Sequence, residues 1–582
     1  MESNIGWIDG SIILLYLVGI VGLGCWIGIR HRRHGGESRD YFLAGGTLTW
    51  PVIGLALFST NISTVHLVAL AQSGYDTGLV YGNFELMAGF TLVLLALFFA
   101  PFYIRSRVAT LPDFLEKRYS RASRDWLALV SILSAIFLHI GFTLYTAALV
   151  MHGLLGIPME IEYLIGTIIV IAGLTALYTA VGGLIAVVTT EAIQTVVLLV
   201  GAFCVTIIAY GEVGGWSGIT ETLSGLQIQN DKGDSYNATV QLSMLRTAEE
   251  PGGMPWYAIM LGYPIIGIWY WCTDQTIVQR VLGAKSEDHA RVGALFAGFI
   301  KILPVFILVF PGLICYALVQ QGAFVDPETG DALSPANSKD AYAFMIQHLL
   351  PVGLRGVVAA ALLAAAMSTV SGALNSVATL FSYDLFKRWV PSMSDHKLVV
   401  VGRIVTVVGM VAAVAWSPFI DQFGSIFDTM VTMICFIAAP ITATFVIGIF
   451  WKGATSRGSI VTLMAGFVVG FLAFVLNQSN DFEWLKPMND AAMSALGGGA
   501  FAELIVKMNS MVASFWLCLL CLAIHVVVSL LTPEEFTEEK ASLVWDNPLS
   551  ALSSPGWSGF GNYRVLTVVL LAFLIVTYYL LA

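Results

Sequence analysis

The sequence contains few charged residues. Only 11% of its 582 residues are Asp, Glu, Lys or Arg, whereas soluble globular domains carry about 25%. Hydrophobic residues make up 57% of the chain, and its mean hydropathy is +0.81. This composition excludes a soluble globular protein, and the net charge of −10 argues against a nucleic-acid partner. We therefore expect an all-α polytopic membrane protein surrounded by the lipid bilayer.

Three other features are absent. None of the seven cysteines lies in a candidate outer loop, so we expect no disulfide framework. The N-terminus lacks the basic segment of a signal peptide, so the first apolar run is expected to remain as a span. The sequence offers no metal-ligand cluster and no nucleophile–base pair, so an enzyme is not expected.

Fourteen apolar runs are long enough to cross a bilayer, because a spanning helix needs about 20 such residues. They lie near residues 8–29, 48–70, 79–104, 126–154, 160–180, 186–210, 255–282, 288–321, 353–386, 398–420, 424–451, 458–476, 509–532 and 562–582. We divide the chain into a first span with a basic cytoplasmic loop (1–46), a transporter core (47–476) and C-terminal loops with two further spans (477–582).

The distribution of positive charge predicts the orientation. Most of the 28 lysines and arginines fall in the loops after the first, third, seventh, ninth, eleventh and thirteenth runs. Arg280, Lys285 and Arg291 are counted in the loop after the seventh run. Because cytoplasmic loops carry the excess of Lys and Arg, we expect these loops inside the cell. Both termini are then extracellular or periplasmic, and the chain is a multi-pass protein of the plasma membrane.

Two of the runs are interrupted by polar residues. The seventh contains Trp269-Tyr270-Trp271-Cys272-Thr273-Asp274-Gln275, and the second contains polar residues from Ser59 to His66. An acidic side chain at a helix centre costs about 2.5–3.5 kcal/mol and marks a candidate functional site. The two interruptions lie five spans apart, so spans two to six would repeat as seven to eleven in inverted topology. Asp274 and its neighbours are expected to cap the break in the seventh run.

Other polar side chains lie inside the remaining runs. His139 is either a packing residue or a ligand contact, and Glu191 and Lys301 either reach toward the cytoplasmic surface or form an ion pair. On the ninth run, Ser368 and Ser371 share one helix face and Thr369 is adjacent. Their hydroxyls would meet carbonyls freed where the second run breaks at Ser59–Ile62, and a small hard cation binds such oxygens.

At these residues the chain resembles the sodium/solute symporter family, in its sodium/glucose cotransporter branch. The matching segments extend from the first run to the eleventh. They include Asp40-Tyr41-Phe42-Leu43-Ala44-Gly45-Gly46, Ser59-Thr60-Asn61-Ile62, Leu177-Tyr178-Thr179-Ala180-Val181-Gly182-Gly183-Leu184, Trp269 to Gln275, Ile277-Val278-Gln279-Arg280, Leu374-Asn375-Ser376 and Phe450-Trp451-Lys452.

The resemblance implies a leucine-transporter-type core of 5+5 inverted repeats and sodium-coupled uptake by alternating access. Its main sodium site, carried over by position, uses backbone carbonyls of Ser59, Ile62 and Ala365 with the hydroxyls of Ser368 and Thr369. A second sodium site in some members would involve Glu191, where Asp is usual, together with Ser371.

The resemblance also places the solute. Its contacts map onto Asn61, His66, Glu85, Tyr270, Trp271 and Lys301, with Tyr270 as the inner gate and Trp271 beneath it. We add His139 and Asp428 as candidate contacts. Two positions depart from the family pattern: a sugar-contacting Gln is Val431 here, and a Thr or Asn is Gly267.

We interpret the chain as a sodium-driven symporter of a sugar or polyol, with Na⁺ as the coupling ion. The nearest alternative is a sodium symporter for another small solute, such as an amino acid or a carboxylate. A cavity-facing arginine would favour a carboxylate, and we expect no arginine in the interior of a span. A sensor or channel built on a transporter fold is the alternative of a different class.

Overall fold

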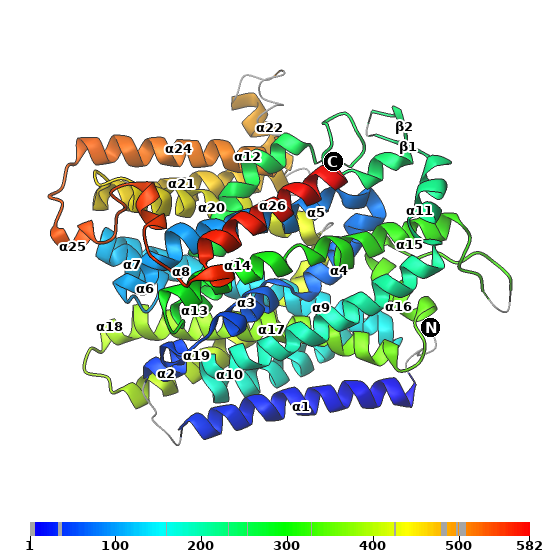
Figure 1. Ribbon diagram of the computed structural model, residues 1–582, viewed down its shortest axis with the longest axis horizontal. Coiled ribbons are helices and arrows are strands. Elements are labelled where there is room, and N and C mark those ends of the chain that lie inside the picture. Colours follow the sequence, from blue (N-terminus) through cyan, green and yellow to red (C-terminus); the bar gives the residue numbers. More distant parts are fainter. Residues whose placement is uncertain are drawn as a thin grey trace.

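The computed structural model describes residues 6–32, 38–158, 160–230, 232–252, 254–326, 329–423, 426–478, 486–495, 499 and 508–582. Long helices packed roughly side by side make up this part of the chain (Figure 1). Part of the predicted basic loop after the first span, residues 33–37, lies outside the described residues, as does much of 479–507.

The helices of the N-terminal half are α1 (Trp7–Arg32), α2 (Ser38–Leu43), α3 (Trp50–Asn61), α4 (Thr64–Thr77), α5 (Gly82–Leu94), α6 (Ala100–Ser106), α7 (Leu111–Arg118), α8 (Arg121–Ser134), α9 (Phe142–Leu155), α10 (Ile161–Glu212), α11 (Gly215–Ser224), α12 (Trp256–Gly267), α13 (Gln275–Leu282) and α14 (Glu287–Ile300).

The helices of the C-terminal half are α15 (Phe310–Gln320), α16 (Ala341–Leu349), α17 (Leu354–Leu380), α18 (Lys387–Trp389), α19 (Asp395–Trp416), α20 (Ile426–Phe450), α21 (Ser456–Gln478), α22 (Lys486–Ala495), α24 (Ser510–Leu531), α25 (Glu538–Ala541) and α26 (Tyr563–Leu581). A single hairpin pairs strand β1 (Gln227–Gln229) with β2 (Ser235–Asn237) in the described residues.

Eleven helical segments of the described chain are long and apolar enough to cross a membrane. The fourteen predicted runs differ from these eleven at three places. α4 continues into α5 and α6 as one 43-residue stretch, α10 joins two predicted spans in 52 residues, and the seventh run is divided between α12 and α13. Each of the fourteen runs therefore has a helical counterpart.

The second run breaks between α3 and α4, at Ile62–Ser63. Ile62 and Ser63 have extended backbone, and the Ser63 side chain caps the new helix by accepting from the Val65 amide at 3.2 Å. The predicted break at Ser59–Ile62 was therefore placed too early, because Ser59 to Asn61 still belong to α3.

The seventh run breaks at Asp274. A π-helical segment, Ile268–Thr273, follows α12, and Asp274 then leaves the helical conformation with φ −83° and ψ 127°. Its carboxylate accepts from the Thr276 amide at 2.7 Å and caps α13. The expected capping by Asp274 is confirmed.

The bend in α10 depends on Gly183. This residue has φ 63° and ψ −167°, a backbone conformation that is essentially restricted to glycine. A Cβ atom there would lie 2.6 Å from the Tyr41 carbonyl oxygen, while the Tyr41 hydroxyl donates to the Ala180 carbonyl at 3.1 Å. Two of the sequence motifs, around Tyr41 and Gly183, therefore pack against each other.

α17 lies at the centre of the bundle, because its side chains from Val358 to Leu380 are buried on every face. A helix that is buried on every side, as α17 is, is typical of the core of a large bundle.

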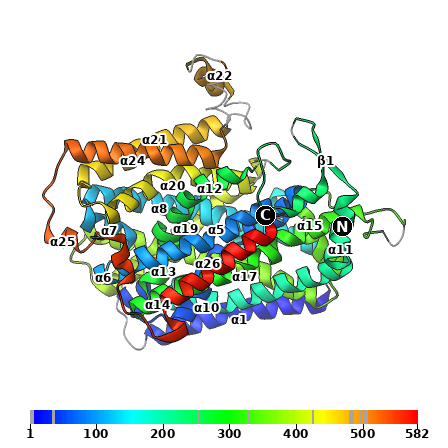
Figure 2. The same cartoon turned by 45° about the horizontal axis from the view of Figure 1, so that its top comes forward.

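Other helices form the edges of the molecule. α1 covers α10 at one edge, while α21 and α24 form the opposite edge (Figure 2).

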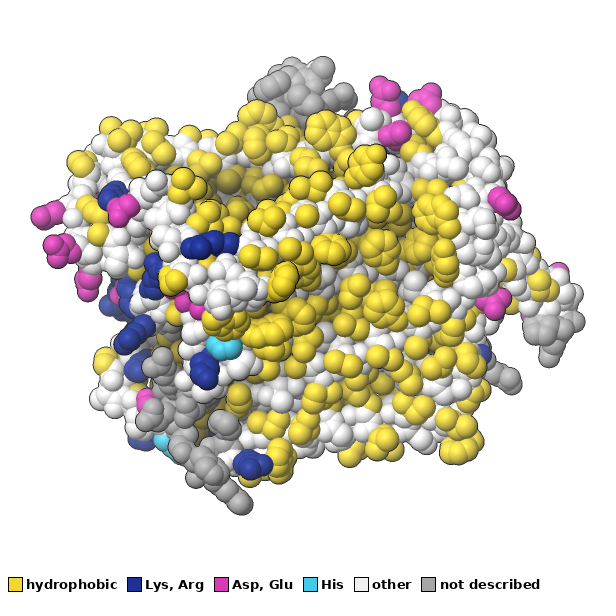
Figure 3. Space-filling model, in the orientation of Figure 1, with side chains coloured by type: hydrophobic (Ala, Val, Ile, Leu, Met, Phe, Trp, Pro, Cys, Tyr) yellow, Lys and Arg dark blue, Asp and Glu magenta, His cyan; other side chains and the backbone are white. Residues whose placement is uncertain are grey.

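The two ends of the bundle differ in charge. On the face in Figure 3, Lys and Arg side chains gather at the end that holds α7 and α18, and a broad apolar band crosses the middle. The start of α1 and the end of α26 lie toward the other end, with α11 and the hairpin (Figure 1). The Met244 amide donates to the carbonyl of Leu581 at 2.7 Å, which ties the end of α26 to this side.

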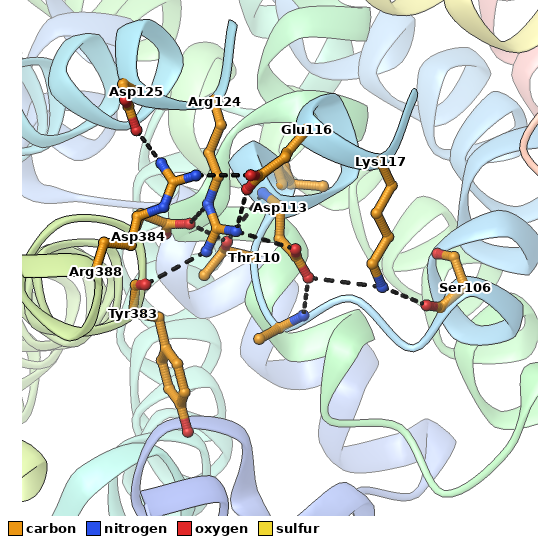
Figure 4. Close-up of polar contacts among 12 residues, drawn as sticks. Ser106, Thr110, Asp113, Glu116, Lys117, Arg124, Asp125, Tyr383, Asp384 and Arg388 are labelled. Atoms are coloured by element: carbon orange, nitrogen blue, oxygen red, sulfur yellow. Dashed lines mark hydrogen bonds and ion pairs between the residues drawn. The ribbon is translucent and has the colours of Figure 1, made fainter. Parts of the chain in front are cut away.

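An ion-pair network crosses the basic end (Figure 4). Arg124 of α8 donates to the buried carboxylate of Asp384 at 2.6 Å and to Glu116 of α7 at 2.6 Å. Arg388 donates to the other oxygen of Glu116 at 2.7 Å and also pairs with Asp125. The network joins α7 and α8 to the segment that follows α17.

Candidate functional site

A cavity of about 100 Å³ lies between the two helix breaks. The side chains that line it include seven of the eight predicted solute contacts: Asn61, His66, Glu85, His139, Tyr270, Trp271 and Lys301. Thr369 of the predicted sodium site also lines it. These residues come from α3, α4, α5, α14, α17 and the two π-helical segments Ala135–Gly141 and Ile268–Thr273, so the fold brings together residues 300 positions apart.

One wall of the cavity is polar, and it consists of an ion pair and a neighbouring side-chain amide. Lys301, at the C-terminal end of α14, pairs with Glu85 of α5 and donates to the Asn61 side-chain oxygen at 2.6 Å. All three side chains are nearly inaccessible, with exposed fractions of 2% for Glu85 and Lys301 and 7% for Asn61. The predicted alternatives for Lys301 were a surface position or an ion pair, and the ion pair is confirmed.

His66 takes part in the break itself. The Ser63 amide donates to His66 Nδ1 at 3.3 Å, so this residue closes a capping box at the start of α4. Because Nδ1 accepts this hydrogen bond, a neutral His66 imidazole carries its hydrogen on Nε2. His66 therefore offers a donor to the cavity that it lines.

Aromatic rings form another wall. Tyr270 and Trp271 meet edge to face with their centroids 5.2 Å apart, and the His139 ring stacks on Tyr270 at 5.8 Å. His139 Nε2 also lies 3.5 Å from the Asp274 carboxylate. The Lys301 ammonium lies 5.7 Å from the centre of the Trp271 ring. His139 is thus both a packing residue and a cavity residue.

A second aromatic cluster also lines the cavity. Phe84 and Phe427 pack perpendicular to each other at 5.2 Å, and both line the cavity. Asp428 does not line the cavity; its carboxylate accepts from the Tyr81 hydroxyl at 3.1 Å beside this cluster. The structure therefore separates Asp428 from the other predicted contacts.

The two departures from the family pattern lie on the cavity wall. Val431 and Gly267 both line it. A Cβ atom on Gly267 would lie 2.7 Å from Thr91 Cγ2 and from Tyr263 Cε1, so neighbouring side chains already fill the place of a larger residue. The cavity thus lacks two polar contacts, and packing explains the absence at Gly267.

Oxygen atoms converge where α17 crosses the end of α3. Ser368 Oγ lies 2.9 Å from the Ser59 carbonyl oxygen and 3.1 Å from that of Ala365. Thr369 Oγ1 donates to the Thr60 carbonyl at 3.0 Å. The break exposes these α3 carbonyls because the amides four residues on, Ser63 and Thr64, lie beyond the helix end.

This cluster fits a small cation. The Ser368 hydroxyl has one proton for two carbonyl oxygens, so acceptors exceed donors there. The Ser59 hydroxyl is buried and has no hydrogen-bond partner in the described part of the chain. The predicted ligands Ser59, Ala365, Ser368 and Thr369 are brought together, and Ile62 borders the same break.

Glu191 is bound by a residue that the sequence analysis placed elsewhere. The guanidinium of Arg280 donates to both Glu191 carboxylate oxygens, at 2.5 and 3.3 Å, and neither residue is exposed. The prediction that Arg280 lies in a cytoplasmic loop is wrong: α13 follows the break at Asp274 as a separate short helix that packs against α3 and α17, and Arg280 is fully buried there. Ser371 donates to the Ser368 carbonyl at 3.0 Å instead of contacting Glu191.

The sequence contained a signal for this pair that the analysis missed. Arg280 follows the break by six residues and lies within the apolar run 255–282. An arginine at such a depth pairs with an acidic side chain or with backbone carbonyls inside the bundle. The same reasoning applies to Lys301, whose partner Glu85 lies 216 positions away in the sequence.

Comparisons with known proteins agree on one family. The model described as "Sodium:solute symporter family" matches residues 41–466. The sodium/myo-inositol cotransporter 2 of Oryctolagus cuniculus is 34% identical over 489 residues, which cover 82% of this chain and 71% of the relative. The sodium/mannose cotransporter of Bos taurus is 33% identical over 568 residues, which cover 94% of this chain and 92% of the relative.

A solved structure shows the fold. A substrate-bound, outward-open Na⁺-coupled sialic acid symporter matches with a TM-score of 0.72 at 20% identity, over 91% of this chain and 100% of that one. The predicted inverted-repeat transporter fold is confirmed by this likeness, which at such identity concerns the fold alone.

Proposed function

The chain belongs to the sodium:solute symporter family, and we propose that the solute it carries with sodium is a sugar or a polyol. It is a multi-pass membrane protein and a sodium-coupled transporter, not an enzyme. The relatives named above carry myo-inositol and mannose by their names, and a sodium/glucose cotransporter 4 of Danio rerio is 34% identical over 80% of this chain. All three solutes are neutral and rich in hydroxyl groups.

The observation that carries the proposal is the Lys301–Glu85–Asn61 group in the cavity. The ion pair has no net charge, so the cavity offers no single uncompensated charge to a carboxylate or an ammonium group. It offers charged donors and acceptors together, which suit hydroxyl groups because each hydroxyl both donates and accepts. The aromatic faces of Tyr270 and Trp271 suit the apolar face of a sugar ring.

The cavity differs at two positions from the glucose-binding pattern that the family resemblance implies. Val431 and Gly267 stand where the resemblance implies polar contacts, so two hydroxyls of glucose would lose their partners. A binding site whose polar groups do not match the hydroxyls of a solute binds that solute much more weakly. We therefore favour a sugar or polyol whose hydroxyls face Asn61, His66, Glu85 and Lys301.

Sodium is proposed to bind at the crossing of α3 and α17. Its ligands would be the carbonyls of Ser59, Ile62 and Ala365 and the hydroxyls of Ser368 and Thr369. Support comes from the spacing of these oxygens and from the excess of acceptors over donors. Unwound carbonyls coordinate ions in this way in secondary transporters.

The two proposed sites share residues, which gives a physical route for coupling. Asn61 lines the cavity, and its neighbours Ser59 and Thr60 present carbonyls to α17. Thr369 lines the cavity and bonds to Thr60. An ion that orders the end of α3 therefore also orders Asn61 for the solute.

Equilibrium binding to the purified protein tests the solute class. A panel of myo-inositol, mannose, glucose, neutral amino acids and small carboxylates is titrated with sodium and with potassium. The proposal predicts saturable binding of at least one sugar or polyol that requires sodium. Sodium-dependent binding confined to amino acids or carboxylates would overturn it and favour the alternative solute class.

A further inference from the structure

A second cavity, here called the side cavity, lies between α8, the π-helical segment Ala135–Gly141, α19, α20 and α21. Its volume is about 400 Å³, and its walls are mostly aromatic and aliphatic side chains. Among the described residues that line it, Ser134 and Trp416 alone carry a side-chain nitrogen or oxygen. Cavities of this size and composition are typical of binding sites for largely apolar ligands.

The side cavity opens on the surface that faces the lipid. Leu133 of α8 and Phe471 of α21 line it and have exposed fractions of 45% and 61%. Both lie on helical segments that are long and apolar enough to cross a membrane. The 14 residues of α8 place Ser134 about 20 Å from Arg121 at the basic end. Because the hydrocarbon core of a bilayer is about 30 Å thick, the cavity lies at the depth of the acyl chains.

Water is a poor occupant of the side cavity. A buried water makes about three hydrogen bonds to the protein. The indole nitrogen of Trp416 already donates to the Phe137 carbonyl at 3.1 Å. The buried Ser134 hydroxyl has no partner in the described part of the chain, and one hydroxyl is too few to hold a water. Empty space would deprive the walls of dispersion contacts, which the acyl chains at the mouth can supply.

The side cavity is separated from the solute cavity by the segment Ala135–Gly141. Leu138 of this segment lines both cavities, and the next residue, His139, stacks on Tyr270 with ring centroids 5.8 Å apart. α19 holds the segment through Trp416 and through Ser417, which donates to the Gly141 carbonyl at 3.1 Å. At the side cavity the segment lacks such packing, so whatever fills this space also supports a wall of the solute cavity.

We propose that the side cavity binds one acyl chain of a membrane lipid, and that the bound chain supports the wall formed by Ala135–Gly141. The lipid site rests on the cavity and its mouth alone. Its effect on the solute rests on the proposed function. The headgroup stays in the membrane surface, while the chain enters past Leu133 and Phe471 and reaches Leu138.

Ser134 offers a matched pair of variants. Because its hydroxyl has no partner in the described chain, Ser134→Phe should fill the side cavity without breaking a hydrogen bond. Ser134→Ala removes the same hydroxyl and leaves the cavity open. If Ser134→Phe cannot be purified, Val130→Phe fills the cavity from the preceding turn of α8.

Photochemical labelling tests the lipid site. The full-length proteins are placed in vesicles of palmitoyl-oleoyl phosphatidylcholine that contain the same lipid with a diazirine on one acyl chain, and the adducts are mapped by mass spectrometry. Leu138 and Phe436 have exposed fractions of only 5% and 4%, so a chain reaches them from inside the cavity. Wild type and Ser134→Ala should carry adducts there, and Ser134→Phe should lose them. Phe573, exposed on α26, should be labelled equally in all three.

Three labelling results would overturn the lipid site. Wild-type adducts confined to the exposed Leu133 and Phe471 would mean that lipid covers only the mouth. Absence of adducts at the mouth as well, with Phe573 labelled, would mean that a second copy of the chain covers it. Adducts at Leu138 and Phe436 that persist in Ser134→Phe would mean that the chain reaches them by another route.

Solute binding tests the supporting role. Methyl-branched acyl chains are wider than straight ones, so wild type and Ser134→Ala should bind the solute more weakly in diphytanoyl phosphatidylcholine than in the straight-chain lipid. Ser134→Phe should bind it equally in both. Equal wild-type affinity in the two lipids, or the same fall in Ser134→Phe, would overturn this role. The labelling result does not depend on the solute, so failure of the proposed function would leave the lipid site standing.

Discussion

At the scale of single residues, the proposed sodium site depends on two α17 hydroxyl groups that donate to backbone carbonyls of α3. We predict that Ser368→Ala/Thr369→Ala raises the sodium concentration for half-maximal uptake at least about tenfold, since each neutral hydroxyl contributes about 1 kcal/mol and 1.4 kcal/mol is tenfold. Ser376→Ala is the matched control on α17, because its buried hydroxyl has no partner in the described chain. Equal sodium dependence in the two proteins would contradict the ion-site assignment.

The ion pair in the cavity gives a second prediction at this scale. Glu85→Ala or Lys301→Ala should weaken solute binding about tenfold to a hundredfold, because hydrogen bonds to charged groups contribute about 1.5–3 kcal/mol. Sodium binding should change less. Separate titrations with solute and with sodium measure how much each affinity falls. A larger fall in sodium affinity than in solute affinity would contradict the assignment of Glu85 and Lys301 to the solute site.

A control removes the complication of an uncompensated charge. Each single variant leaves one buried charge without its partner, which by itself is destabilising. The double variant Glu85→Gln/Lys301→Met restores neutrality. It should recover the thermal stability of the wild type while solute binding stays weak.

At the scale of structural elements, the bend of α10 depends on one glycine. Gly183→Ala should destabilise the protein by about 1–3 kcal/mol, the cost of this backbone region for a residue with a side chain, and the added Cβ also meets Tyr41. Gly173→Ala on the same helix has no atom within 4 Å and serves as the control. Thermal unfolding of the two purified proteins measures the contrast; equal midpoints would show that the bend tolerates a side chain.

The network at the basic end predicts a dependence on pH. Burial alone raises the pKa of Glu116, but the hydrogen bonds and charges of Arg124 and Arg388 outweigh it and hold that pKa below its ordinary value of 4.5. A carboxylate with a lowered pKa stabilises the fold above the ordinary value and ceases to do so as the pH falls through the lowered one.

Glu116→Gln should therefore lower the unfolding midpoint near pH 7 and reduce the further loss between pH 5 and pH 3. The expected effect is about 1 kcal/mol or less, because the Glu116 side chain is one-third exposed. Glu538→Gln on α25, an exposed position, is the control. An unchanged acid dependence in Glu116→Gln would show that this network does not stabilise the fold.

The sequence predicted the elements better than their contacts. Apolar length located all fourteen runs, and the polar residues at 59–66 and 269–275 located both breaks to within a few residues. The pairing of charges could not be predicted in the same way. Glu191 pairs with Arg280 because the fold packs α10 and α13 into the same part of the bundle, and that arrangement depends on tertiary packing rather than on apolar length.

At the scale of the whole molecule, the charge asymmetry leads us to propose that the basic end lies in the cytoplasm and both termini outside. Glu221→Cys on α11 should react with a membrane-impermeant maleimide in intact cells, whereas Glu538→Cys on α25 should react only after the membrane is opened. The unsubstituted chain is the control, because its seven cysteines are wholly or partly buried. The opposite labelling pattern would reverse the orientation.

The two breaks explain how one molecule can link an ion to a solute. Unwinding at Ile62–Ser63 frees carbonyls for α17, and the π-helical segment just before Asp274 contributes Tyr270 and Trp271 to the same cavity. Each sodium ion that enters down 100 mV supplies about 2.3 kcal/mol before any concentration gradient is counted. The energy supplied per ion, together with the sodium gradient, limits how far a solute can be concentrated.

Uptake of labelled sugars and polyols into proteoliposomes measures sodium-driven transport itself. We predict that at least one of them accumulates above its external concentration when sodium is high outside and low inside. Potassium in place of sodium should abolish the accumulation. Uptake that proceeds equally in potassium, or that is confined to amino acids or carboxylates, would contradict a sodium-driven symporter of a sugar or polyol.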